Sequence, residues 1–269
     1  MTLLPAADAT TDDVLAFEAP YRVRFDESGP DGIARTSTIL RYAQDVAWQH
    51  STARGFDRDW YSQRSLTWLV RAAALEIVAS VPLGTTIVSR TAVIGQRRVW
   101  ARRRGEFSLP DGAPVGWVHT DWVMIDGRGS LTRIPEIFAE QFPIPESTGQ
   151  IGRVPLPATP ADAARREFLA RRQELDPMGH VNNAVYLDWF EEAVVLASPG
   201  DGSRALSRTP RLYRLEYAAA ADPGAAIADA AWLDADGGWS YRLTNLDGTD
   251  LFRARLDPPA QPTAIGDTP

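Results

Sequence analysis

The chain has 269 residues, a formal net charge of −7 and no cysteine. The absence of cysteine excludes a disulfide framework, a thiolate nucleophile and a cysteine-based zinc site, and the negative charge argues against broad nucleic-acid binding. All 28 basic residues are arginine, which excludes lysine Schiff-base chemistry. No run of about 18 apolar residues exists, so we expect no membrane span. The first residues lack the pattern of a signal peptide, and a cytoplasmic protein is therefore expected.

The first half of the chain reads as a strand, a turn, a helix and a series of strands. Residues 21–25 alternate as a strand, a turn follows at 28–32, and residues 37–53 have the apolar spacing of a helix that ends at Gly55. Turn signals then separate four strand-like runs, at 66–78, 85–94, 98–107 and 115–126.

The second half repeats this order after a linker. Residues 143–163 carry five prolines and are typical of an extended connection. A strand near 166–173, a turn and a helix over 183–196 follow. Four further strands are predicted near 211–219, 227–234, 239–245 and 250–256.

The two halves are copies of one unit. Gly29–Val46 aligns without a gap on Asp176–Ala193, an offset of 147 residues. The offset has fallen to 140 where Glu76 aligns with Glu216, as expected when hairpins shorten in one copy.

One strand, one long helix and a run of antiparallel strands, occurring twice, predict an α+β fold. We expect the two units at 18–142 and 164–257 to pack like the subunits of a dimer, each with a sheet wrapped around its own helix.

A carboxylate and an imidazole mark the second copy. Asp176 and His180 lie four residues apart on a turn that leads into a helix. The first turn of a helix has unbonded N–H groups, so the backbone at Gly179, Val181 and Asn182 could polarise an acyl carbonyl. The first copy has Gly29 and Ile33 at the two reactive positions. We therefore interpret the first half as scaffold and substrate wall, and the second as the catalytic half.

Each of these residues also has a purely structural interpretation. Asp176 could cap its turn and His180 could be a surface imidazole. Asn182 and Asn183 could serve only as helix N-caps. Glu191, in the middle of the helix, could be simply solvated, as could the next residue, Glu192.

The other histidines favour no reaction. His50 lies on an apolar helix face and is expected in the core, and His119 lies in a predicted strand. No cluster has metal-ligand spacing, so we expect neither a metal nor a cofactor.

The densest basic run is Arg97–Arg104. Within it, Arg102, Arg103 and Arg104 are candidates for docking an acidic carrier protein or the phosphates of coenzyme A. The alternative is a solvated strand pair with alternating faces.

The chain resembles the acyl-acyl carrier protein thioesterases, a tandem hot-dog family of plants and bacteria, from about residue 20 to 256. The resemblance is carried by motifs in both halves: Ser28-Gly-Pro-Asp-Gly-Ile-Ala, Leu66-Thr-Trp-Leu-Val70, Asp121-Trp-Val-Met124, Arg133-Ile-Pro-Glu136, His180-Val-Asn-Asn183, Tyr186 and Leu215-Glu-Tyr217. It implies two hot-dog domains and hydrolysis of fatty acyl thioesters on acyl carrier protein. It also implies that Asp176 and His180 are catalytic.

The sequence departs from the plant pattern at two places. Met178 replaces an Asn, and Ala220-Ala221 replace a Glu-Cys pair. Three alternatives therefore stay open: a hot-dog thioesterase acting on coenzyme A esters, a hot-dog hydratase or dehydratase, and a catalytically silent acyl-binding protein. The hydratase families have four residues between acid and imidazole, whereas three lie between them here. A homodimer is left open too.

Overall fold

The computed structural model describes residues 15–144 and 149–259. The predicted linker therefore includes four residues, 145–148, that lie outside the described part. The first half contains β1 (Phe17–Arg22), α1 (Thr36–Ala53), α2 (Arg58–Gln63), β2 (Leu66–Ile77), β3 (Thr86–Arg97), β4 (Trp100–Ser108), β5 (Pro114–Asp126) and α3 (Glu136–Gln141). The second half contains β6 (Ala164–Leu169), α4 (Asn183–Ala197), α5 (Pro199–Ser207), β7 (Arg211–Tyr217), β8 (Ala226–Leu233), β9 (Trp239–Asn245) and β10 (Asp250–Leu256).

The strands form one ten-stranded antiparallel sheet in the order β1-β3-β4-β5-β2-β7-β10-β9-β8-β6. Read from either edge, the order is the same once each strand is replaced by its copy. The predicted α+β duplication is confirmed. One feature differs from the expectation of two separate sheets: the halves join edge to edge through β2 and β7, with Ala72 opposite Glu216 and Ile77 opposite Arg211.

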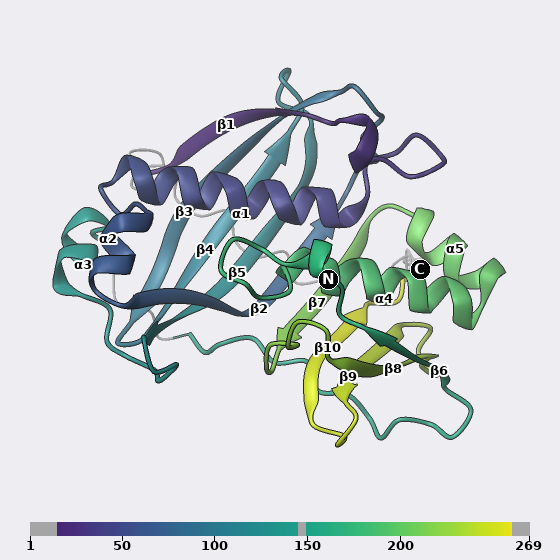
Figure 1. Cartoon of the computed structure of the whole chain (residues 1–269). Helices are drawn as coiled ribbons and strands as arrows, with labels where there is room; N and C mark the ends of the chain where they lie inside the picture. The colour runs from purple at the N-terminus through teal and green to yellow at the C-terminus, as the bar shows by residue number, and fades with distance from the viewer. Residues whose placement is uncertain (1–14, 145–148, 260–269) are drawn as a thin grey trace, which may run out of the picture.

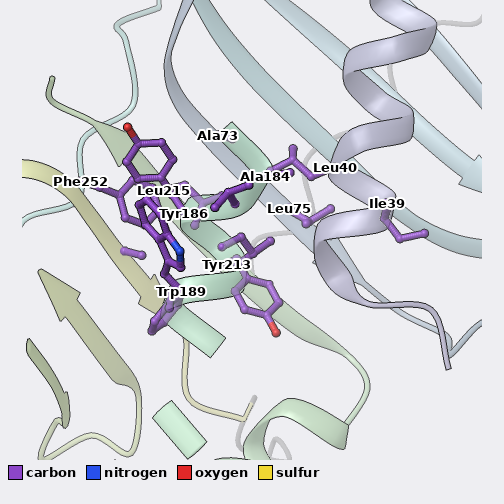
Figure 2. Packing of buried hydrophobic residues seen from close by; sticks show 14 of the residues in the cluster. Ile39, Leu40, Ala73, Leu75, Ala184, Tyr186, Trp189, Tyr213, Leu215 and Phe252 are labelled. Carbon is purple, nitrogen blue, oxygen red and sulfur yellow. The ribbon is translucent and has the colours of Figure 1, made fainter. Parts of the chain in front are cut away.

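Both long helices lie on the same face of this sheet (Figure 1). α1 packs against β1 and β3, α4 packs against β6, β8 and β9, and the two helices contact each other. The helices pack on a common core that crosses the β2–β7 seam, as the side chains of Leu40, Leu75, Tyr186 and Leu215 show (Figure 2). No helix in the described ranges is long and apolar enough to cross a membrane.

The duplicated turns have the same backbone hydrogen bonds. The N–H of Gly29 donates to the carbonyl of Ile33 at 2.8 Å, and the N–H of Asp176 donates to the carbonyl of His180 at the same distance. The fourth residue of each turn is a glycine with positive φ, +73° at Gly32 and +81° at Gly179. Side chains with a Cβ rarely adopt this conformation, which explains why both copies have glycine there.

The linker crosses the sheet face opposite the helices. The N–H of Gly152 donates to Asp121 on β5 at 2.7 Å, and the N–H of Val154 donates to Glu216 on β7 at 2.9 Å. Both carboxylates are buried, and both lie on the sheet face that alternates away from the core. The linker therefore ties the two half-sheets together near their seam.

Candidate active site

The Asp176 carboxylate uses only one of its two oxygens within the protein. Oδ1 accepts the N–H of Met178 at 2.8 Å and that of His180 at 3.3 Å. The capping role expected of an acid at this position is thus present. In the described part of the chain, Oδ2 forms no hydrogen bond. The turn therefore fixes the carboxylate and leaves one oxygen available to a ligand.

His180 follows on the same turn and its side chain is exposed. In the described structure its imidazole forms no hydrogen bond with Asp176; the hydrogen bonds between the two residues come from their backbone N–H groups. The two predicted catalytic residues are brought together at one site, but not as a hydrogen-bonded acid–imidazole pair.

The start of α4 differs from the prediction for the oxyanion donors. The N–H of Gly179 already donates to the Asp176 carbonyl at 3.0 Å, and that of Asn182 donates to Glu174 at 2.9 Å. Asn182 caps the helix, its side chain accepting the N–H of Ala184 at 2.9 Å. These two N–H groups are therefore not free for a ligand.

Val181 and Asn183 have N–H groups with no partner among the described residues. Val181 is 3% exposed and its side chain belongs to the core, so it does not line the site. Asn183 is the first residue of α4 and does line the site. Its N–H, at the positive end of the helix, is the better candidate donor to an oxyanion.

Asp176, His180 and Asn183 open onto a cleft of about 1350 Å³ formed by both halves of the chain. The second half contributes the 176–183 turn and the ends of α4 and β7. The first half contributes α1, α2 and the inner faces of β2, β4 and β5. Residues from the first half that line the cleft include Ser51, Tyr61, Trp68, Val70, Arg71, Val93, Ala101, Arg103, Trp122 and Phe138.

Two tyrosines that the search for reactive groups did not single out as catalytic form the wall beside Asp176. The Tyr217 hydroxyl donates to the Asn183 carbonyl at 3.0 Å, and the Tyr186 hydroxyl accepts the N–H of Ala221 at 2.9 Å. Burial raises the pKa of Tyr186 to about 12, and the negative charge of Asp176 adds to this effect. Tyr186 is therefore protonated at neutral pH, and its O–H can donate to a ligand.

The two residues at the positions of the family Glu-Cys pair, Ala220 and Ala221, have small apolar side chains. Ala220 lines the cleft, and Ala221 is buried with its N–H on Tyr186. Arg71 approaches from the first half and donates to the Ala218 carbonyl at 2.7 Å. Neither alanine carries a thiol or a carboxylate, and Asp176 is the cleft-lining acid on the turn that leads into α4.

The three arginines predicted to dock a carrier do not form one surface. Arg102 pairs with Asp121 at 2.7 Å and also donates to the linker carbonyl of Gln150 at 2.9 Å. Arg104 pairs with Glu106. Arg103 lies on the opposite face of β4, toward α1. Docking through Arg102 and Arg104 stays a prediction, while Arg103 lines the cleft instead.

The remaining titratable candidates lie away from the cleft. His50 is 1% exposed, and burial lowers its pKa to about 3, with the charge of Arg103 adding to the effect. Burial also lowers the pKa of His119. Glu191 is not simply solvated, because it accepts the Tyr213 hydroxyl at 2.5 Å and burial raises its pKa. Glu192 pairs with Arg166 at 2.8 Å. No group of metal-ligating residues occurs in the described ranges.

Comparison with known proteins agrees with this architecture. Residues 14–141 match the acyl-ACP thioesterase N-terminal domain, and residues 158–231 match the acyl-ACP thioesterase C-terminal domain. The chain belongs to the acyl-ACP thioesterase family. The family members are thioester hydrolases, and the two matched regions correspond to the two copies of the repeat.

Among curated relatives, oleoyl-acyl carrier protein thioesterase 1 of Arabidopsis thaliana is 25% identical over 205 residues. The match covers 68% of this chain and 56% of that protein, so the chain spans about half the length of this relative. Acyl-[acyl-carrier-protein] hydrolase FATB2 of Cuphea viscosissima is 25% identical over 67% of this chain and 48% of its own length.

Two solved structures share the fold over nearly the whole chain. A Lactobacillus plantarum protein described as an oleoyl thioesterase has a TM-score of 0.78 at 18% identity, covering 90% of this chain and 94% of that one. The 12:0-ACP thioesterase of Umbellularia californica has a TM-score of 0.73 at 18% identity, covering 90% and 96%.

Proposed function

We propose that this protein hydrolyses fatty acyl thioesters of acyl carrier protein to free fatty acid and carrier. One observation supports this above all: Asp176 has one oxygen fixed by its turn, and the other has no partner among the described residues. Asp176 lines the same cleft of about 1350 Å³ as Asn183, whose N–H is also unbonded there. The curated relatives named above are thioesterases of acyl carrier protein substrates, which favours this carrier over coenzyme A.

The geometry suggests how hydrolysis would proceed. The thioester carbonyl oxygen would accept the Asn183 N–H, so that the charge developing there is stabilised at the helix N-terminus. Oδ2 of Asp176 would either take a proton from a water molecule that attacks the carbonyl carbon, or attack that carbon itself to form an anhydride that water then opens. In both cases the C–S bond breaks, and the carrier leaves as a thiol after its sulfur gains a proton.

The two halves would divide this work. We propose that the second half, 164–257, supplies the reacting groups and that the first half, 18–142, forms the wall along which the acyl chain lies. His180 would assist by orienting the thioester from the exposed side of the turn. A cytoplasmic location and a homodimer are predictions made from the sequence and family resemblance that await direct measurement.

The test is turnover of acyl carrier protein thioesters by the purified full chain, over acyl groups of increasing length, beside the same acyl groups on coenzyme A. Release of free acid mainly from the carrier protein esters supports the proposal. Turnover restricted to coenzyme A esters would favour the alternative carrier. Binding of either ester without any hydrolysis would make the protein an acyl-binding protein instead.

A further inference from the structure

In the first half, the cleft is lined by an arginine that has no acidic partner among the described residues. Arg103 projects from β4 toward α1 and lines the cleft. Its Nη1 donates to His50 Nδ1 at 3.0 Å and lies 3.3 Å from Thr91 Oγ1. No carboxylate pairs with this guanidinium within the described residues, in contrast to its neighbours Arg102 and Arg104.

Arg103 is half-buried, and a cation that loses part of its water without gaining an acidic partner is unfavourable. Burial lowers the pKa of Arg103 to about 10, so the group still carries its charge at neutral pH. His50 cannot offset that charge: the nitrogen facing Arg103 accepts its hydrogen bond, which requires a neutral imidazole. The inner end of the cleft is therefore positively charged.

Other polar groups gather around the same end. The Tyr61 hydroxyl lies 3.1 Å from Ser51 Oγ and accepts the indole N–H of Trp68 at 3.0 Å, and all three side chains line the cleft. Tyr61 and Arg103 line the same cleft. The apolar residues Val93, Ala101 and Phe138 also line the cleft.

This polar end is remote from the reacting groups. β5 and β2 lie between β4, which carries Arg103, and β7, which ends at the catalytic cleft wall. Three strand spacings correspond to about 14 Å across the sheet. A chain attached to a thioester at Asp176 would thus run past apolar residues before its far end reaches Arg103.

A methyl-ended acyl chain would displace water from Arg103 without providing a hydrogen-bond acceptor for the guanidinium. We propose that the cleft selects acyl groups with an oxygen-bearing substituent, foremost a carboxylate, at the end remote from the thioester. A carboxylate there would supply the counter-charge that the fold omits, and a hydroxyl would supply an acceptor. This inference rests on the proposed function, since it takes the other end of the chain to be the thioester at Asp176.

The first test compares turnover of acyl carrier protein thioesters of equal length that end in a methyl, a hydroxyl or a carboxylate. We expect kcat/KM for the carboxylate-ended ester to exceed that of the methyl-ended ester by about tenfold or more, the size expected of one buried charged hydrogen bond. Arg103→Met, of similar length but apolar, should abolish or reverse this preference. Arg104→Met, on the opposite face of β4, should leave it unchanged.

Binding tests the inference separately from catalysis. Amide analogues of the carboxylate-ended and methyl-ended substrates cannot turn over, and their affinities can be measured by calorimetry. Tighter binding of the carboxylate-ended amide by the natural protein than by Arg103→Met supports the inference even if no thioester is hydrolysed. Arg103→Gln provides a second variant should the methionine variant unfold. Equal affinity for both amides, or equal losses on both in the variants, would overturn the inference.

Discussion

The turns at 29–33 and 176–180 share their backbone and differ in where the acid lies. In the first turn, Oδ1 of Asp31 accepts the N–H of Ile33 at 3.0 Å. In the second turn, Met178 occupies the place of Asp31, and Asp176 accepts the N–H groups from two positions earlier. One carboxylate caps each turn, so capping alone does not explain why the acid is at the third position in the first turn and at the first position in the second.

An acid at the first position of the turn would lie against an acid at the third. A Cβ at Gly29 would lie 2.9 Å from Oδ1 of Asp31, too close for an undisturbed side chain. An acid at the first position of the turn therefore requires the Asp31 carboxylate to shift from its present place. In the second copy the third position is Met178, which is 53% exposed and has no carboxylate to compete with Asp176.

The surroundings of the two turns differ as well: the region beside the first turn is closed, and the region beside the second is an open cleft. The region around the first turn that corresponds to the cleft encloses only about 10 Å³. Ile39 and Ile77 stand there in place of Tyr186 and Tyr217. The comparison teaches that duplication preserved the backbone while side-chain exchange closed one site and opened the other.

Replacement of Asp176 by Asn should give the largest effect. The Asn side-chain oxygen can still accept the N–H groups of the turn, so the fold should be retained while the free carboxylate oxygen is lost. We expect kcat/KM for an acyl carrier protein thioester to fall by about 10²- to 10⁴-fold with little change in thermal unfolding. Asp31→Asn is the matched control and should keep normal turnover, and equal losses in both variants would mean that the turns act only through stability.

Asn183→Pro removes one N–H and tests the oxyanion donor. Proline is favoured at the first helical position, and the preceding Asn182, with φ −59° and ψ 134°, already has a conformation compatible with it. Turnover should fall by about 10²-fold, as for other single oxyanion donors. Asn183→Ala, which keeps the N–H, should retain most activity; if both variants lose activity alike, the side chain rather than the backbone is required.

His180→Ala should have a smaller effect. The imidazole is exposed and forms no hydrogen bond with Asp176 in the described structure, so we expect a loss below the roughly 10²-fold typical of a general base or acid. Steady-state kinetics would show whether the change is mainly in KM, as a thioester-orienting role implies. A loss as large as that of Asp176→Asn would assign His180 to proton transfer.

The smallest effect concerns stability at low pH. The His50 pKa is about 3 in the fold and near 6.5 in an unfolded chain, so the unfolded state binds the extra proton between these values. Stability from the neutral imidazole is complete above about pH 6.5 and declines as the pH falls toward 3. His50→Gln, which can still accept from Arg103, should show a shallower loss of unfolding free energy between these pH values; identical slopes would contradict the assignment.

The sequence was sufficient for the duplication and for both turns, because glycines with positive φ and helix spacing leave strong local patterns. It placed Asp176 and His180 at one site for the same reason. It could not identify Asn183 as the free donor, because that depends on which neighbouring N–H groups are bonded to Glu174 and Asp176 in the folded turn. The joining of β2 to β7 is likewise a long-range pairing without a local signal.

For the arginine run Arg97–Arg104, counting charges gave the wrong prediction of a single basic surface, although the spacing along the strand indicated two faces. Alternation along a strand places Arg102 and Arg104 on one face and Arg103 on the other. Period-two spacing in the sequence already contained this information, whereas counting charges suggested a single surface. Glu106, the partner of Arg104, lies two residues away on the same strand, whereas Asp121, the partner of Arg102, comes from β5 and becomes its neighbour only in the sheet.

Our central claim is that the second turn carries the catalytic groups and that the first turn is its structural copy. A crystal structure of Asp176→Asn with a bound acyl-pantetheine thioester tests this claim most directly. We predict the thioester carbonyl oxygen within hydrogen-bond distance of the Asn183 N–H, the carbonyl carbon facing residue 176, and the acyl chain running past Trp68 into the first half. A thioester bound beside Ile33 in the first copy, or one in the cleft with its carbonyl directed away from α4, would contradict the claim.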